Sequence, residues 1–401
     1  MSKVILDTKE FASMLSRVSK CSVKGGVDIL AELIELRLNN GVLSLRTTDS
    51  RNIMILRKSG VEGDDFVATI SLDVFEKIVS RTSKEKIELV VDDRAVELRG
   101  NGVYNFPLTI EGDEPITFKP LELLDSPDLK KQLKVADIRK VIAVNGGFVG
   151  SPFVYANISG FYFSDNAVST DSIACSYLRK KLFEDEPIML YPQTLQLVAD
   201  MTEEDVTFIK KGSSIQFVSS TCLVSSVSHS EIDEFPIEGL NNYLNSEFTS
   251  NVTISRKAAR DILDRVSFFV DMKAEFGATV LDFTEAGITI TDRRGKASEV
   301  LPYINPVNFE PYTCFIPAAD FMKILDLDGD DNVKLWYGND DAIRVDSGDI
   351  TRILALLSDN DFDNGVDFGS DESQEAPQVE GSIPDVEFSE VESDNLSDIQ
   401  W

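Results

Sequence analysis

The stretch Phe11-Ala12-Ser13-Met14-Leu15-Ser16-Arg17-Val18 opens a pattern that the chain contains three times. Its apolar residues fall at i, i+3, i+4 and i+7, which predicts a helix with one buried face. Two further stretches follow at a spacing of roughly 120 residues: Ile138-Arg139-Lys140-Val141-Ile142-Ala143-Val144 and Ala259-Arg260-Asp261-Ile262-Leu263-Asp264-Arg265-Val266. Only the second lacks the last apolar position, where Asn145 stands. A unit that recurs in this way decides the fold.

Each predicted helix is followed by a strand pair and then by a Thr-Asp step. The turn signals of the strand pairs are Asn39-Asn40-Gly41, Ser164-Asp165-Asn166 and Glu285-Ala286-Gly287. These residue types favour tight reversals. The Thr-Asp steps are Thr48-Asp49, Thr170-Asp171 and Thr291-Asp292. Their nearly equal intervals are the clearest single mark of the repeat.

A second helix is predicted in each unit, at 71–79, 192–198 and 317–325, and further strands follow it. In the first unit these strands are predicted at 86–91 and 95–98, and in the third at 333–336 and 343–345. The pattern predicts an α+β fold of three tandem domains, each with two helices packed on antiparallel sheets. We expect domains at 1–122, 128–246 and 250–359, with linkers at 122–127 and 241–246.

The charge distribution limits how the chain can meet nucleic acid. Its net charge is -30, and residues 361–401 hold 13 carboxylates and no Lys or Arg. Residues 1–360 include 56 acidic and 39 basic residues, so this part of the chain has a net charge of -17. Any DNA contact must therefore use a local basic surface. Because residues 360–401 are rich in Asp, Glu, Ser and Gly, we expect them to form a disordered acidic tail.

The sequence does not favour an enzyme, a metal site or a membrane protein. Its cysteines, Cys21, Cys175, Cys222 and Cys314, are scattered, and His229 is the only histidine, so we expect no metal, disulfide or catalytic residue. No glycine-rich phosphate cradle is found, and we expect no cofactor. No apolar run approaches the ~20 residues of a membrane helix. We expect a cytoplasmic protein, in a bacterial cell or a phage-infected host, with no membrane partner.

Three helix–sheet–helix–sheet units in this order resemble the beta clamp of bacterial DNA polymerase III. The resemblance covers residues 1 to about 358. It also rests on Ser169-Thr170-Asp171 and on Asp233-Glu234-Phe235-Pro236, similar to the family's Phe-Pro step. It implies a head-to-tail homodimeric ring that encircles duplex DNA without sequence specificity, tethers a DNA polymerase and is loaded by a clamp loader. Departures in the middle domain and the C-terminus are compatible with a bacteriophage-encoded member.

The inner wall of such a ring carries scattered cations that touch phosphates without reading bases. The residues assigned to this role lie on the first helices, in a loop that resembles a DNA-contacting loop of the family, or after a second helix. They are Arg17, Lys20, Lys24, Arg81, Lys84, Arg139, Lys140, Arg256, Arg260 and Arg265. The alternative interpretation is that these cations belong to ordinary solvated helix faces.

The resemblance further implies an apolar pocket between domains 2 and 3 for short peptides of replication proteins. By that resemblance its lining is Ile158, Thr170, Ile173, Cys175, Pro236, Ile353, Leu354 and Ala355. The family often has Gly-His-Arg-Leu after Thr-Asp, whereas Ser172-Ile173-Ala174-Cys175 stands here. This departure predicts a more apolar pocket. The alternative is that these residues belong to the core.

Two alternative functions stay open. One is a clamp-fold interaction protein that binds replication proteins without encircling DNA. The other is a hydrolase on an unrelated repeat fold that uses His229.

The tail ends in Leu396-Ser397-Asp398-Ile399-Gln400-Trp401, which weakly resembles the peptides that clamps bind. It could occupy its own pocket, recruit another protein or only keep the chain soluble.

Overall fold

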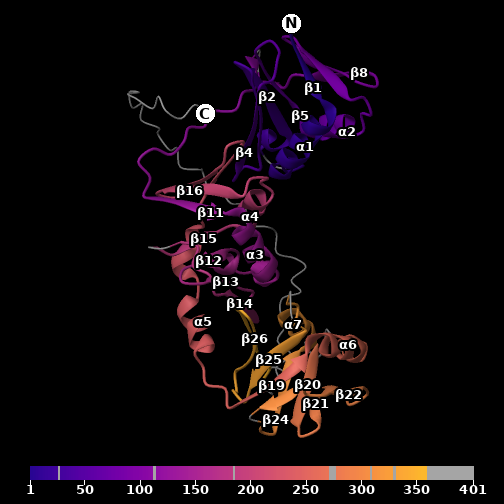
Figure 1. Ribbon diagram of the computed structural model, residues 1–401, viewed down its shortest axis with the longest axis vertical. Helices are drawn as coiled ribbons and strands as arrows, with labels where there is room; N and C mark the ends of the chain where they lie inside the picture. The colour runs from indigo at the N-terminus through magenta and orange to yellow at the C-terminus, as the bar shows by residue number, and fades with distance from the viewer. Residues whose placement is uncertain are drawn as a thin grey trace, which may run out of the picture. The chain divides into compact units, whose positions relative to one another are not determined.

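The computed structural model describes residues 1–25, 28–111, 114–183, 186–270, 277–307, 309–327 and 331–358. The predicted tail lies outside the described residues. Residues 1–358 form one compact unit, in which an order of elements recurs three times (Figure 1). Each repeat contains the order strand, helix, four strands, helix, three strands; repeat 1 adds two short strands at its end, repeat 2 adds a helix at its end, and repeat 3 adds one strand before its second helix. The domain boundaries expected from the sequence stay a prediction.

The elements of each repeat follow in chain order. Repeat 1 has β1 (Ser2–Asp7), α1 (Thr8–Val18), η1 (Ser19–Cys21), η2 (Ile29–Glu32), β2 (Leu33–Asn39), β3 (Val42–Thr48), β4 (Ile53–Ser59), β5 (Phe66–Ser71), α2 (Leu72–Ser80), β6 (Lys86–Val91), β7 (Ala95–Arg99), β8 (Val103–Pro107), β9 (Ile110–Glu111) and β10 (Glu114–Pro115). Repeat 2 has β11 (Leu129–Lys134), α3 (Val135–Asn145), η3 (Gly146–Phe148), η4 (Ala156–Ile158), β12 (Phe161–Phe163), β13 (Ala167–Thr170), β14 (Ala174–Leu178), β15 (Ile188–Leu190), α4 (Pro192–Ala199), β16 (Asp205–Lys211), β17 (Ser214–Val218), β18 (Cys222–Val227), η5 (Ser230–Glu234) and α5 (Ile237–Leu244). Repeat 3 has β19 (Ser250–Ser255), α6 (Arg256–Ser267), β20 (Ala278–Thr284), β21 (Gly287–Asp292), β22 (Ser298–Leu301), β23 (Asn305–Val307), β24 (Tyr312–Pro317), α7 (Ala318–Ile324), β25 (Asn332–Tyr337), β26 (Ala342–Ser347) and β27 (Ile350–Ala355).

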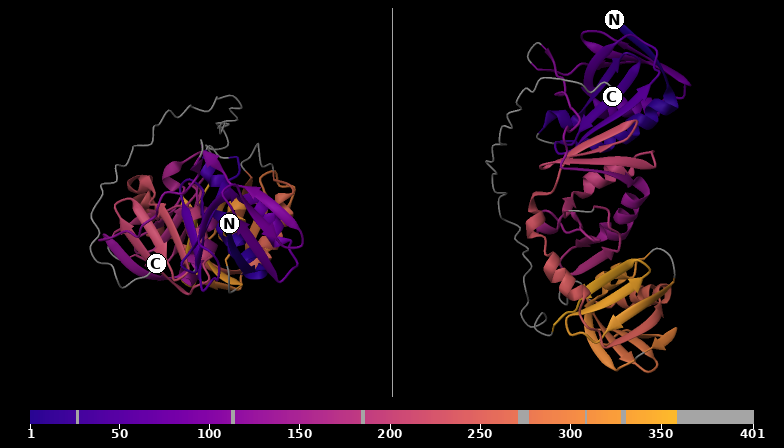
Figure 2. Two further views of the ribbon diagram at one scale, coloured as in Figure 1. Left: turned by 90° about the horizontal axis from the view of Figure 1, so that it is seen from above. Right: turned by 60° about the vertical axis from the view of Figure 1, so that its left-hand side comes forward.

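Two long antiparallel sheets cross the boundaries between repeats. In the first, the strand order is β11-β16-β17-β18-β4-β3-β2-β5, so β18 of repeat 2 pairs with β4 of repeat 1. In the second, the order is β15-β12-β13-β14-β27-β26-β25-β19-β23, so β14 of repeat 2 pairs with β27 of repeat 3. The right-hand view of Figure 2 shows the indigo and pink strands of the first sheet side by side. We call these two strand pairings junction 1–2 and junction 2–3.

Two four-stranded sheets, β1-β6-β7-β8 in repeat 1 and β22-β21-β20-β24 in repeat 3, and the two-stranded sheet β10-β9 are the other sheets of the described residues. The two four-stranded sheets lie one in each terminal repeat. Each is half the size of the sheet at junction 1–2. Strand β8 ends the first of them and β22 ends the second. Both strands thus have an open backbone edge in the described part of the chain.

The helices form where the apolar stripes predicted them. In α1 the four stripe residues Phe11, Met14, Leu15 and Val18 are all buried, and the Asp7 side chain accepts a hydrogen bond from the Glu10 N–H at the helix start. The helices pack in pairs, α1 with α2, α3 with α4 and α6 with α7. Within the described residues, no helix is long and apolar enough to cross a membrane.

The segment expected as a linker at 241–246 is largely helical, because α5 extends over most of it. Ile237, Leu240 and Leu244 are spaced like a helix stripe and pack on a buried cluster described below. The Asn-rich sequence concealed that stripe, since Asn is a weak helix former.

Candidate functional site

Two of the predicted DNA-contacting lysines take part in ion pairs that cross a junction. Lys20 Nζ lies 2.8 Å from Asp200 Oδ2 at junction 1–2, and Lys140 Nζ lies 2.6 Å from Asp349 Oδ2 at junction 2–3. All four side chains keep solvent contact, so each pair contributes only about 0–1 kcal/mol. A phosphate oxygen can therefore compete with either carboxylate for its lysine.

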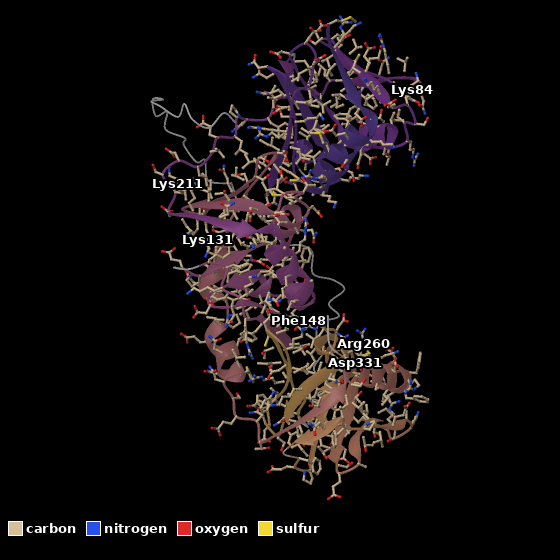
Figure 3. All side chains as sticks on the ribbon, in the orientation of Figure 1. Lys84, Lys131, Phe148, Lys211, Arg260 and Asp331 are labelled. Atoms are coloured by element: carbon tan, nitrogen blue, oxygen red, sulfur yellow. The ribbon has the colours of Figure 1, made fainter. Side chains whose placement is uncertain are left out.

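Two of the three predicted DNA-contacting cations of α6 pair with carboxylates. Arg265 makes a two-bonded pair with Glu299, at 2.8 and 2.6 Å, and this hydrogen bonding raises the pKa of the Arg265 guanidinium. Arg260 pairs with Asp326. Arg256 starts the helix and donates its N–H to the Asp331 carbonyl oxygen at 2.8 Å. Figure 3 shows Arg260 and Asp331 beside this helix.

Two predicted DNA contacts are instead used by the fold itself. Arg139 donates from Nε to the carbonyl oxygen of Ala199 and from Nη2 to that of Met201, both at 2.7 Å, and so caps the C-terminal end of α4. Arg17 is half-buried, and its Nε and Nη2 are enclosed without a hydrogen-bond partner among the described residues. These guanidinium groups are less available to phosphates than the lysines.

Three predicted cations of repeat 1 are exposed. Lys24 pairs with Asp73, and this hydrogen bond raises the pKa of Lys24. Arg81 stands at the C-terminal end of α2, and Lys84 lies in the loop before β6 (Figure 3). For Arg81 and Lys84, no carboxylate of the described residues lies within ion-pair distance. Both are therefore available to phosphates.

The predicted peptide-site residues separate into two groups. Ile158, Cys175 and Ile353 belong to one buried apolar cluster at junction 2–3. We call it the junction cluster: Ile158, Tyr162, Val168, Cys175, Tyr177, Met189, Phe235, Ala342 and Ile353. Burial raises the pKa of the Cys175 thiol to about 12, so it stays protonated. These three residues are buried in this structure, and their role as a peptide pocket stays a prediction.

The other predicted peptide-site residues lie around that cluster. Thr170 is buried in its turn, where its hydroxyl donates to the Ala174 carbonyl oxygen at 2.9 Å. Leu354 belongs to the main core, and Ala355 is half-buried. Pro236 and Ile173 are exposed. Neither belongs to the buried part of the junction cluster.

Sequence reasoning missed the aromatic members of the junction cluster. The rings of Tyr162 and Phe235 are stacked, with centroids 4.6 Å apart and planes 7° apart. Tyr177 is buried on the strand that crosses the junction. Phe235 belongs to the quoted Phe-Pro step, but its partner ring lies far away in sequence. No local pattern could have paired them.

The geometry of His229 disfavours the hydrolase alternative. Its Nδ1 accepts a hydrogen bond from the Glu231 N–H, so the proton of the neutral ring is on Nε2, which lies 3.0 Å from Ser159 Oγ. Ser159 in turn donates to the Ala156 carbonyl oxygen at 2.8 Å. The imidazole therefore donates to the serine, the reverse of what a general base does. Burial lowers the pKa of His229.

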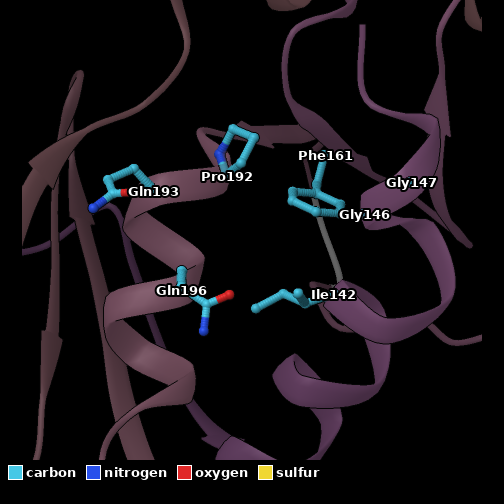
Figure 4. A pocket seen from close by; sticks show the side chains of 7 residues that line it. All are labelled: Ile142, Gly146, Gly147, Phe161, Pro192, Gln193 and Gln196. Carbon is cyan, nitrogen blue, oxygen red and sulfur yellow. The ribbon is translucent and has the colours of Figure 1, made fainter. Parts of the chain in front are cut away.

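A shallow cavity of about 420 Å³ lies between α3 and α4 (Figure 4). Its lining is apolar at Ile142, Phe161 and Pro192, and amide side chains come from Gln193 and Gln196. Gln193 Nε2 donates to the Lys20 carbonyl oxygen at 3.1 Å, so that amide serves junction 1–2. Among the described residues, no group of three His, Cys, Asp or Glu side chains is placed to hold a metal ion.

Comparison with known proteins shows the fold. Neither a family model nor a curated protein matches the sequence. Solved structures do match. The DNA polymerase III beta subunit of Thermotoga maritima is 15% identical over 89% of this chain and 100% of that chain, with a TM-score of 0.76. The beta chain of Streptococcus pneumoniae is 12% identical over 89% and 100%, with a TM-score of 0.79.

A further match is the sliding clamp of Pseudomonas aeruginosa bound to griselimycin, 13% identical over 89% of this chain and 99% of that chain, with a TM-score of 0.77. At these identities the likeness concerns the fold alone. The predicted α+β clamp fold is confirmed. The site residues and the phage origin stay predictions.

Proposed function

We propose that this chain is a DNA sliding clamp, a non-enzymatic processivity factor that encircles duplex DNA and tethers a polymerase in the cytoplasm. The fold supports this proposal, since it is shared with bacterial DNA polymerase III beta subunits. Scattered exposed cations on an otherwise acidic body favour weak, sequence-independent phosphate contacts. A ring stays on DNA by topology, so such weak contacts are sufficient.

The strand order carries the proposal. Strand β8 of repeat 1 has the position in its repeat that β18 and β27 have in theirs, and β22 corresponds to β4 and β14. Both junctions within the chain join these two kinds of strand, β18 with β4 and β27 with β14. The remaining members of the series are β8 and β22. A second copy continues the same pairing head to tail, and two copies close a ring of six repeats.

Exposed apolar side chains at the two open ends support this closure. Val103 on β8 and Val300 on β22 are 63% and 49% exposed. Val74 on α2 and Thr194 on α4 occupy the same position, three residues after the N-cap of their helix. Val74 is 55% exposed, whereas Thr194 is buried and donates to Asn52 across junction 1–2. The end of α6 has Phe268, which is 85% exposed. Contact with a second copy would cover such residues.

The open edges give the experiment. A variant with Val103→Cys and Val300→Cys is treated with a flexible bis-maleimide, with each single variant as its control. If β8 pairs with β22, the double variant yields covalently linked copies and the single variants do not. Linkage as efficient in a single variant, or none in the double variant, contradicts the closure.

A clamp-fold protein that binds replication proteins without encircling DNA is the second candidate. The observation in its favour is that Lys20, Lys140, Arg260 and Arg265 already pair with carboxylates of this chain. In that case, copies linked by bis-maleimide would not be trapped on circular DNA. Trapping of linked protein on circular DNA therefore distinguishes the two candidates.

A further inference from the structure

The segment from Ser230 to Leu244 crosses the junction cluster and is held there by one buried side chain. Within residues 230–249, Phe235 is the only buried residue. Neither η5 nor α5 buries a residue of its own, and Ile237, Leu240 and Leu244 are only half-buried against the cluster. A segment with so few buried contacts opens at a low free-energy cost. We call it the cover segment.

The remaining contacts of the cover segment are few and near the surface. Asn157 Nδ2 donates to the Glu234 carbonyl oxygen at 3.0 Å, and Arg344 Nη1 donates to the Leu244 carbonyl oxygen at 3.2 Å. The stack of Phe235 on Tyr162 adds only about 0.5–1.5 kcal/mol beyond the burial of the rings. Burial of the Phe235 ring is therefore the main interaction that keeps the cover segment in place.

Beneath the cover segment, the junction cluster contains an unused hydrogen-bond donor. Tyr177 is buried, and its hydroxyl has no hydrogen-bond partner among the described residues. Burial raises the pKa of Tyr177, so the group stays a neutral O–H that can donate. A buried hydroxyl without a partner costs about 1–3 kcal/mol. A ligand that offers an acceptor here recovers that cost.

We infer that Phe235 is an internal plug, whose place on the Tyr162 ring is taken by an aromatic side chain of a partner peptide when the cover segment opens. The Tyr177 hydroxyl then donates to a carbonyl oxygen of that peptide. The inference rests on the proposed function, because it assigns the partner chemistry to the predicted peptide site. Exchanging one ring for another preserves the packing of the cluster, and the new hydrogen bond favours the peptide.

The opening is measured first without any ligand, in the full chain. Cys175 is a buried member of the junction cluster, so opening of the cover segment should make it more accessible to a thiol reagent. Phe235→Ala should accelerate labelling of Cys175 about tenfold. The control Phe153→Ala removes an exposed ring of the same repeat and should leave the rate unchanged. Peptide mapping by mass spectrometry identifies the labelled cysteine. An unchanged rate in Phe235→Ala contradicts the plug.

Binding tests the partner chemistry. The probe is a fluorescein-labelled peptide with the sequence of residues 396–401, and the same peptide with Ala in place of its Trp is the control. Phe235→Ala should bind the probe about fivefold more tightly, since the competing ring is gone. Tyr177→Phe should bind it about fivefold more weakly but be no less stable, because it removes an unsatisfied hydroxyl. The Ala-containing peptide should bind weakly to every variant.

Three results would overturn the inference in distinguishable ways. Weaker binding by Phe235→Ala makes Phe235 a wall of the site instead of a plug. Wild-type binding by Tyr177→Phe excludes the hydroxyl contact. If Phe235→Ala accelerates labelling of Cys175 but no variant binds the probe, both the peptide ligand and the proposed partner site are contradicted. Ring closure is tested separately, by the bis-maleimide linkage of Val103→Cys with Val300→Cys.

Discussion

Arg352 donates from Nη2 to the Val144 carbonyl oxygen at 2.9 Å, although the two residues belong to repeats 3 and 2. Its Nη1 donates to the carbonyl oxygen of Lys323, within the last turn of α7, at 3.0 Å and to that of Asp326, beyond the helix, at 2.6 Å. The guanidinium carbon also lies 4.7 Å from the centroid of the Phe148 ring. One buried cation thus satisfies carbonyl groups at the C-terminal ends of two helices across junction 2–3.

Arg352→Met should therefore destabilise the protein by about 3 kcal/mol, because it leaves several buried carbonyl groups without donors. Urea unfolding at pH 7.5 measures the loss. Arg179→Met is the matched control: Arg179 is at the same junction and donates to Thr351, but it is half exposed. The control should change stability by less than about 1 kcal/mol. Equal losses would mean that the buried position of Arg352 is not decisive.

Replacing Arg81 and Lys84 by Ala should weaken DNA binding and its salt dependence. These exposed cations have few internal ties, so they are available to phosphates. If both touch phosphates, the slope of log K against log[salt] falls by about 1.8. Fluorescence anisotropy with duplex DNA gives the slope. Lys130→Ala with Lys134→Ala, on the exposed face of β11, removes the same charge elsewhere and should leave the slope unchanged. Equal slopes in both double variants would refute the assignment.

Asp349→Asn should strengthen DNA binding. The substitution releases Lys140 from its ion pair across junction 2–3 and removes one negative charge from the same surface. Because that pair is exposed, stability should change by less than about 1 kcal/mol. The same anisotropy assay should show affinity higher by a few-fold and a steeper salt dependence. Asp165→Asn removes the same charge beside Lys181, which was not predicted to touch DNA, and serves as the control. Weaker binding by Asp349→Asn would place Lys140 away from DNA.

The protein should lose stability as the pH falls from 7.5 to 5.5, partly through His229. Burial lowers the pKa of His229 in the folded state, so the unfolded chain takes up a proton first, near the ordinary pKa of about 6.5. Stability from this group is complete above that pH and declines below it. Protonation would also remove the acceptor that holds the Glu231 N–H. His229→Gln should therefore show a smaller drop in unfolding free energy than the wild type. An identical drop would assign the pH dependence to other groups.

The repeat could be predicted because its signals are local. The Thr-Asp step recurs for a structural reason: Asp49, Asp171 and Asp292 each accept backbone N–H groups of the turn that follows them. A short polar side chain at this position closes the turn. These turn motifs and the one-faced helices depend on residues that are close in sequence, so the sequence alone is enough to predict them.

The candidate sites were less predictable because they depend on distant partners. Arg139 looked like a solvated helix cation, yet it caps α4 about sixty residues away in sequence. Ile158, Cys175 and Ile353 were predicted to line a peptide pocket, and the structure places them in one buried cluster on which the cover segment packs. Helix α5 was missed because packing on the junction cluster outweighs its weak helix propensity.

The most direct measurement is topological trapping of the linked protein. The variant with Val103→Cys and Val300→Cys is mixed with circular plasmid DNA, linked with bis-maleimide and washed at high salt. If two copies close around the duplex, linked protein stays with the circular plasmid through the wash and is released when a restriction enzyme linearises it. Linked protein that washes off the circle, or that remains bound after linearisation, contradicts encirclement.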